Sequence, residues 1–199
     1  MDNILNIVNP SHIGYTGSLR NSGDEAGDAW FTPKEWVERF RYILGGIELD
    51  QFSSEDANRN VQAQRYFTKE NSAFHQLEWR AKTVFMNPPY SRGLCDRAIR
   101  RLISEFDAGR VGRALVLVNN MTDTQWWHIM AANSERICFL EGRIAFMSND
   151  NKRISGNTRG QNVFLLLKMK APNVRARFER TLAPHGIVVA RSYKGFENG

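Results

Sequence analysis

Four consecutive residues, Asn87-Pro88-Pro89-Tyr90, follow a short apolar run and combine groups that suit methylation of a planar amine. Such an amine is a poor nucleophile because its lone pair is delocalised. The Asn87 side-chain oxygen and the Pro88 carbonyl could accept hydrogen bonds from it and favour a pyramidal nitrogen. The prolines fix φ and remove backbone donors, and Tyr90 offers a flat face for an extruded base. We therefore predict that Asn87, Pro88, Pro89 and Tyr90 are catalytic; the alternative is a proline turn that closes a strand.

The elements that would position this turn form an alternating pattern. Strands are predicted at 47–50, 83–86, 113–118, 136–140, 143–147, 162–169 and 187–190, and helices from a Thr32–Glu35 capping box to Gly45-Gly46, at 55–66, at 92–106 and after Thr122–Gln125. Strands that alternate with helices, followed by a closing group of strands, indicate a three-layer α/β sheet. Residues 1–28 predict a flexible arm, which leaves 29–199 as a single domain.

Composition limits the classes of protein to which the chain can belong. Its 2 cysteines, Cys95 and Cys138, are too few for a disulfide framework and favour a reducing, cytoplasmic setting. The longest apolar runs, Ala114–Val118 and Val163–Leu167, are too short to cross a bilayer, and nothing at the N-terminus suggests export. The 4 histidines lack the spacing of metal ligands, so we predict no metal.

The charge is divided unevenly along the chain. Residues 1–79 hold 7 Lys/Arg against 12 Asp/Glu, whereas residues 80–199 hold 20 against 9. A basic second half predicts contact with a polyanion, and nucleic acid is the leading partner. Arg92, directly after the proline turn, is a candidate for a phosphate contact. The basic polar loop 148–161, with Lys152, Arg153 and Arg159, is the best local candidate for gripping or reading DNA.

Several blocks occur in an order that resembles a known family. The blocks are Ala29-Trp30-Phe31-Thr32-Pro33, Glu48-Leu49-Asp50, Trp79, Asn87-Pro88-Pro89-Tyr90, Thr122-Asp123-Thr124-Gln125-Trp126-Trp127 and Gly142-Arg143-Ile144-Ala145-Phe146. Over residues 28–170 the chain resembles the phage-type DNA N-6-adenine-methyltransferases, the Dam family of phages. The resemblance implies a compact Rossmann-like methyltransferase fold, S-adenosylmethionine as methyl donor and adenine in DNA as substrate. It also suggests a role in shielding phage DNA from restriction.

The resemblance also implies positions for the cofactor. Trp30, Phe31, Thr32 and Pro33 look like the segment that borders the methionine end of the cofactor at a helix start, where free N–H groups suit a carboxylate. Asp50 ends the first predicted strand, where doubly wound sheets bind ligands. Arg143 lies in the Gly142–Phe146 block and is a further candidate for DNA binding.

Two departures from larger methyltransferases leave the cofactor site incompletely defined. No glycine-rich turn follows the first strand, because Asp50 is followed by Gln-Phe-Ser-Ser-Glu-Asp. Only residues 51–86 separate Asp50 from Asn87, so the acidic residue that would hold the ribose is not identified. Asp56, Asn58 and Glu70 are the candidates.

Alternatives remain open at this point. The Asn-Pro-Pro-Tyr geometry suits any planar amine, so a cytosine amine or a glutamine side chain is a rival substrate, although the basic second half argues against glutamine. Because the glycine-rich turn is missing, a second interpretation stays open: a DNA-binding protein that has the same fold but no catalytic activity.

Overall fold

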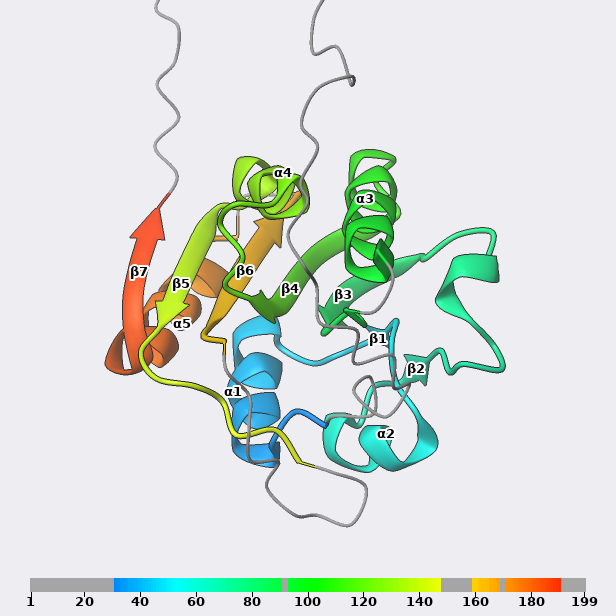
Figure 1. The fold of residues 1–199 in the computed structure, drawn as a ribbon, viewed down its shortest axis with the longest axis horizontal. Helices are drawn as coiled ribbons and strands as arrows, with labels where there is room; N and C mark the ends of the chain where they lie inside the picture. Colours follow the sequence, from blue (N-terminus) through cyan, green and yellow to red (C-terminus); the bar gives the residue numbers. More distant parts are fainter. Residues whose placement is uncertain (1–30, 91–92, 148–158, 169–170, 191–199) are drawn as a thin grey trace, which may run out of the picture.

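A single mixed β-sheet organises residues 31–90, 93–147, 159–168 and 171–190, which are those that the computed structural model describes (Figure 1). Its 7 strands lie in the order β2-β1-β3-β4-β6-β5-β7. They are β1 (Leu49–Asp50), β2 (Arg65–Tyr66), β3 (Ala81–Met86), β4 (Val111–Asn119), β5 (Arg136–Leu140), β6 (Gln161–Leu167) and β7 (Gly186–Ala190).

Strand direction brings the ends of several strands to one edge of the sheet. β1 pairs in parallel with β2 and β3, and β3 pairs in parallel with β4. β6 runs antiparallel to β4 and β5, and β7 antiparallel to β5. The arrowheads of β3, β4 and β5 therefore point to the same edge, where β6 begins (Figure 1). We call this the carboxyl edge; it is where α/β sheets of this kind bind ligands.

Helices cover both faces of the sheet, which confirms the predicted three layers. The helices are α1 (Lys34–Leu44), α2 (Glu55–Val61), α3 (Leu94–Asp107), α4 (Gln125–Asn133) and α5 (Pro172–Leu182), with short 3₁₀ turns η2 (Ala73–His75) and η4 (Ala183–His185). α3 packs beside α4, and α1 packs beside α5. None of the helices in the described ranges is long and apolar enough to span a membrane.

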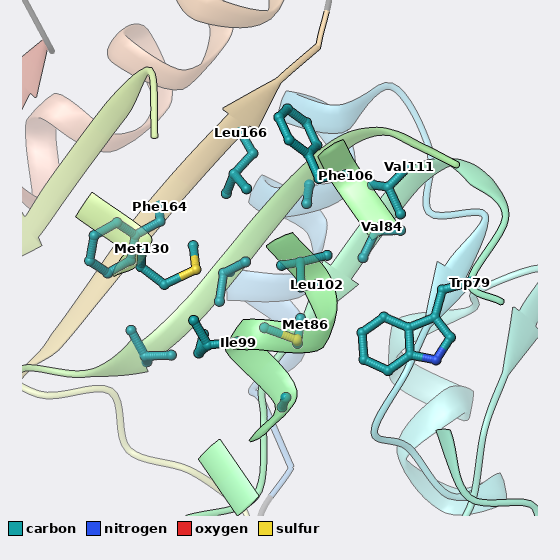
Figure 2. Packing of buried hydrophobic residues seen from close by; sticks show 14 of the residues in the cluster. Trp79, Val84, Met86, Ile99, Leu102, Phe106, Val111, Met130, Phe164 and Leu166 are labelled. Carbon is teal, nitrogen blue, oxygen red and sulfur yellow. The ribbon is translucent and has the colours of Figure 1, made fainter. Parts of the chain in front are cut away.

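The core divides into two clusters because side chains alternate along each strand. In β4, Ala114, Val116 and Val118 join the cluster of α3 and α4, together with Trp79 and Phe164. Figure 2 shows this cluster around Leu102, Met130 and their neighbours. The intervening residues Leu115 and Leu117 join the cluster of α1 and α5.

Two predictions about the elements were wrong, and one helix was missed. The helix predicted at 55–66 ends at Val61 because Gln62 is left-handed, with φ 48°, and Arg65–Tyr66 forms β2 instead. Residues 143–147 form no strand; only Met147 bridges to Phe31. Helix α5 was not predicted at all. The predicted arm at 1–28 lies outside the described residues.

Candidate active site

The proline turn leaves the sheet at the carboxyl edge, between two parallel neighbours. Asn87 directly follows β3, whose last residue Met86 pairs with Val116 of β4. Pro88 is buried. At the far end of the turn the Tyr90 hydroxyl accepts a hydrogen bond from the Asn119 backbone N–H at 2.8 Å. The turn is therefore anchored to the ends of two adjacent strands.

The Asn87 amide is held by its nitrogen and leaves its oxygen unused. Nδ2 donates to Thr32 Oγ1 at 3.4 Å. Oδ1 is buried and has no hydrogen-bond partner among the described residues. A buried acceptor without a partner costs about 1–3 kcal/mol. An oxygen in this state can accept a hydrogen bond from an amine that enters the site.

Tyr90 is partly buried and packs against the cluster beneath α3. Burial raises the pKa of its hydroxyl well above the usual value, and the Asn119 N–H and the positive charge of Arg159 offset only part of this rise. The hydroxyl therefore stays protonated at neutral pH, and its role is to fix the ring. Arg159 lies close enough to this hydroxyl to influence its pKa.

Asp50 and Gln51 form a second buried polar group at the carboxyl edge. Asp50 is 2 % exposed, and its Oδ1 accepts a hydrogen bond from the Phe52 N–H at 3.2 Å. Burial raises its pKa from 3.8 to about 6, against smaller opposing contributions from hydrogen bonds with Phe52 and Ser53. Gln51 is 1 % exposed, and neither polar atom of its amide has a hydrogen-bond partner among the described residues.

The segment that precedes α1 lies against the proline turn. Phe31 and Met147 exchange two backbone hydrogen bonds, of 2.8 and 2.9 Å, and Thr32 is 5 % exposed. The predicted capping box was wrong: the N-cap is Pro33, and α1 has no side-chain cap. The Thr32 hydroxyl contacts Asn87 instead. Trp30, the first residue of the predicted cofactor segment, lies outside the described residues.

The three candidates for holding the ribose have different surroundings. The Asn58 amide is used within the protein, since it accepts from the Ala63 N–H at 2.8 Å and donates to the Ala63 carbonyl at 3.3 Å. Asp56 is exposed and pairs with Arg59 at 3.2 Å. Glu70 is exposed on the segment after β2, which leaves the sheet beside β1. Of the three, Glu70 is the one that follows a strand of the sheet, whereas Asp56 and Asn58 belong to α2.

Only part of the predicted DNA-binding set falls within the described residues. Arg159 precedes β6 at the carboxyl edge, is exposed, and its Nη1 approaches the Met121 sulfur at 3.0 Å. Arg143 is also exposed; the next residue, Ile144, donates its N–H to Gln161 Oε1 at 2.9 Å. Arg92, Lys152 and Arg153 lie outside the described residues, as does loop 148–158. No cluster that could hold a metal ion occurs in the part of the chain that is described.

A hollow of about 450 Å³ lies beside this site but is not lined by it. Its walls come from the start of α1, from Asn60 and from the 143–147 segment, and include Pro33, Trp36, Arg143 and Met147. Neither Asn87 nor Asp50 lines it. We place the candidate site at the carboxyl edge because the unpartnered buried polar atoms of Asn87 and Gln51 lie there.

Sequence reasoning missed two residues of this site. Gln51 directly follows the first strand, at the position where larger methyltransferases carry a glycine-rich turn. That position could have indicated Gln51 as a candidate for cofactor binding. Asn119 binds Tyr90 through its backbone N–H, which no residue type could reveal.

Comparisons with known proteins identify the family that the chain resembles in sequence. A sequence model of the family described as DNA N-6-adenine-methyltransferase (Dam) matches residues 20–186. The chain is 25% identical over 171 residues to a DNA N-6-adenine-methyltransferase of Escherichia phage T1, covering 78% of this chain and 69% of that protein. It is 26% identical over 148 residues to a DNA N-6-adenine-methyltransferase of Haemophilus phage HP1 (strain HP1c1), covering 73% and 81%.

Proposed function

Because the chain belongs to the DNA N-6-adenine-methyltransferase (Dam) family, we propose that its Asn87–Tyr90 turn binds the target adenine, next to a cofactor site that includes Asp50 and Gln51. Family membership makes the protein an adenine-specific DNA methyltransferase with a Rossmann-like methyltransferase fold. It also implies a methyl donor of the S-adenosylmethionine type and DNA as substrate. The roles of individual residues are our proposal.

One observation carries the assignment of the turn: Asn87 Oδ1 is buried without a partner while the amide nitrogen is held by Thr32. The adenine amine offers two N–H donors, and Oδ1 together with the Pro88 carbonyl supplies two acceptors. These hydrogen bonds favour a pyramidal nitrogen whose lone pair is available for attack. Pro88 and Pro89 hold the carbonyls in place, so most of the catalysis comes from positioning and polarisation of the amine.

The residues around Asp50 fit a polar cofactor. S-adenosylmethionine supplies, when bound, a methyl group made electrophilic by a positively charged sulfur. The amino and hydroxyl groups of the cofactor can donate hydrogen bonds to the Asp50 carboxylate and to Gln51 Oε1. Gln51 Nε2 can donate a hydrogen bond to an acceptor of the cofactor. Phe31, Thr32 and Pro33 lead into α1, and we propose that the N–H groups at the start of this helix bind the cofactor's carboxylate, while the Thr32 hydroxyl is used by Asn87. Among the candidates for the ribose, we assign Glu70.

Gln51 provides a direct test of the cofactor site. We expect Gln51→Leu to weaken S-adenosylmethionine binding about tenfold, because the cofactor loses hydrogen bonds to the amide. The free energy of unfolding should not fall, since the replaced amide has no partner among the described residues. Calorimetric titration with S-adenosylmethionine and thermal unfolding would measure both. The matched control is Gln64→Leu, at an exposed position; unchanged cofactor affinity in the Gln51 variant would remove Gln51 from the site.

The two parts of Tyr90 should contribute unequally. Tyr90→Phe loses the hydrogen bond from Asn119 but keeps the ring, so methyl transfer should fall by about threefold or less. Tyr90→Ala removes the ring on which the adenine stacks and should lower methyl transfer by about 10–100-fold. Rates of methyl transfer to unmethylated genomic DNA would separate them. Equal losses in the two variants would show that the ring does not stack on the base.

We propose that Arg159 contacts a DNA phosphate close to the extruded nucleotide. The other basic residues proposed to contact DNA are Arg92, Arg143, Lys152 and Arg153. Arg159→Ala should weaken DNA binding and reduce the slope of log affinity against log salt concentration by about 0.9. Fluorescence anisotropy with any labelled duplex at several salt concentrations would measure the slope. Arg180→Ala, exposed on α5, is the matched control. If both variants leave the slope unchanged, Arg159 contacts no phosphate.

A further inference from the structure

The Thr32 hydroxyl is not used as its position in the chain suggests. A threonine just before a helix commonly accepts a hydrogen bond from an N–H of the first turn. In α1, however, Trp36 and Val37 donate to the Pro33 carbonyl, at 3.0 and 3.1 Å, and no side chain caps the helix. The buried hydroxyl accepts a hydrogen bond from Asn87 Nδ2 instead, across 55 residues of sequence.

In this contact the Thr32 hydroxyl accepts from the amide nitrogen, and the oxygen is the end of the Asn87 amide that stays open to the substrate. An amide has donors on one side and an acceptor on the other. With the nitrogen on Thr32, the oxygen remains unpartnered for the target amine. Rotation of the amide by half a turn would point its NH₂ at the NH₂ of adenine, donor against donor. We propose that Thr32 is a positioning residue that keeps the Asn87 oxygen directed at the adenine amine.

Thr32 itself has little freedom to move. The paired backbone hydrogen bonds between Phe31 and Met147 fix the residue before Thr32. The next residue, Pro33, has its own φ fixed by its ring and also restricts the backbone of Thr32. The hydroxyl is 3.4 Å from Nδ2, which is long for a hydrogen bond. Catalytic hydrogen bonds are often long without substrate and shorten in the productive complex. This contact is therefore able to tighten as the amine binds Oδ1.

The test compares Thr32→Val, which keeps the shape and loses the hydroxyl, with Thr32→Ser, which keeps the hydroxyl. The inference rests on the proposed role of Asn87. We expect Thr32→Val to lower kcat about tenfold and to leave KM for S-adenosylmethionine within about twofold, while Thr32→Ser keeps kcat within about threefold. The assay is methyl transfer to unmethylated genomic DNA. Thr181→Val, on α5, is the matched control.

Several results would overturn the inference. They are an unchanged kcat in Thr32→Val, an equal loss in the valine and serine variants, or a raised KM for S-adenosylmethionine with kcat intact, which would make Thr32 a cofactor contact. Should the valine variant unfold, Thr32→Ser still decides, since a tenfold loss there with normal cofactor binding contradicts the inference. An active Asn87→Ala enzyme would instead refute the proposed role of Asn87. An inactive Asn87→Ala beside a fully active Thr32→Val would refute only the role of Thr32.

Discussion

Asn87→Ala is expected to lower the formation of N6-methyladenine by at least about 100-fold, because the adenine amine loses the acceptor that the Asn87 side chain supplies. The affinity for S-adenosylmethionine should stay within about twofold, since Asn87 polarises the amine and leaves cofactor binding to Asp50 and Gln51. The loss therefore belongs to kcat. Removing one well-placed polar group from an active site commonly has an effect of this size.

The stability of the same variant gives an independent check. In the wild type, Asn87 makes one long hydrogen bond to Thr32 and holds an unpartnered buried oxygen. Losing the first and relieving the second have opposite effects, so the free energy of unfolding should change by less than about 1 kcal/mol. An active-site residue that can be removed at little cost to stability is one retained for chemistry.

Two measurements would test this expectation. Mass spectrometry of nucleosides from a host without adenine methylation reports activity in cells, and thermal unfolding of the purified variant reports stability. Asn173→Ala, exposed on α5, is the matched control. Methyladenine at wild-type level in the Asn87 variant would refute the proposed role of the turn.

The layered fold was predictable because its strands carry strong local patterns. β4 and β6 contain the continuous apolar runs Ala114–Val118 and Val163–Leu167, and such runs are typical of strands buried on both faces. β2 was not predictable because two residues carry no periodicity; backbone pairing with β1 defines it. Helix α5 was missed although its buried residues Val174, Phe178 and Leu182 recur every four residues, because charged residues fill most of the positions between them.

The part of the candidate site that could be predicted is the part whose residues are close together in the sequence. Asn87 and Tyr90 lie in one short turn, so their proximity follows from the sequence. The partner of the Asn87 amide lies 55 residues away, and only the packing of α1 against the sheet brings Thr32 to it. A capping box describes local hydrogen bonds and could not anticipate this competing partner. The unpartnered state of Gln51 is likewise a property of the packed interior.

Asp50→Asn should make the protein more stable and a poorer binder of S-adenosylmethionine at about pH 8. Asp50 is buried, and its pKa is raised from 3.8 to about 6, so above that pH the fold holds an ionised carboxylate at a cost. The shift corresponds to at most about 3 kcal/mol. Asparagine carries no charge and keeps an oxygen for the Phe52 N–H. The cofactor, however, loses a charged acceptor, which should weaken its binding by about tenfold or more.

The sign of the pH dependence separates this account from a simple packing effect. Because the pKa of Asp50 is raised, the folded state binds a proton more tightly than the unfolded state between 3.8 and about 6. The stability advantage of Asp50→Asn should be full above about pH 6 and vanish as the pH falls toward 3.8. Wild-type affinity for the cofactor should fall through the same pH range as the carboxylate is protonated, while the affinity of the variant stays constant.

Thermal unfolding and calorimetric titration across pH would measure both, with Asp107→Asn, exposed at the end of α3, as control. A variant that is less stable than the wild type above about pH 6, or binds the cofactor equally well there, would show that Asp50 is a structural residue.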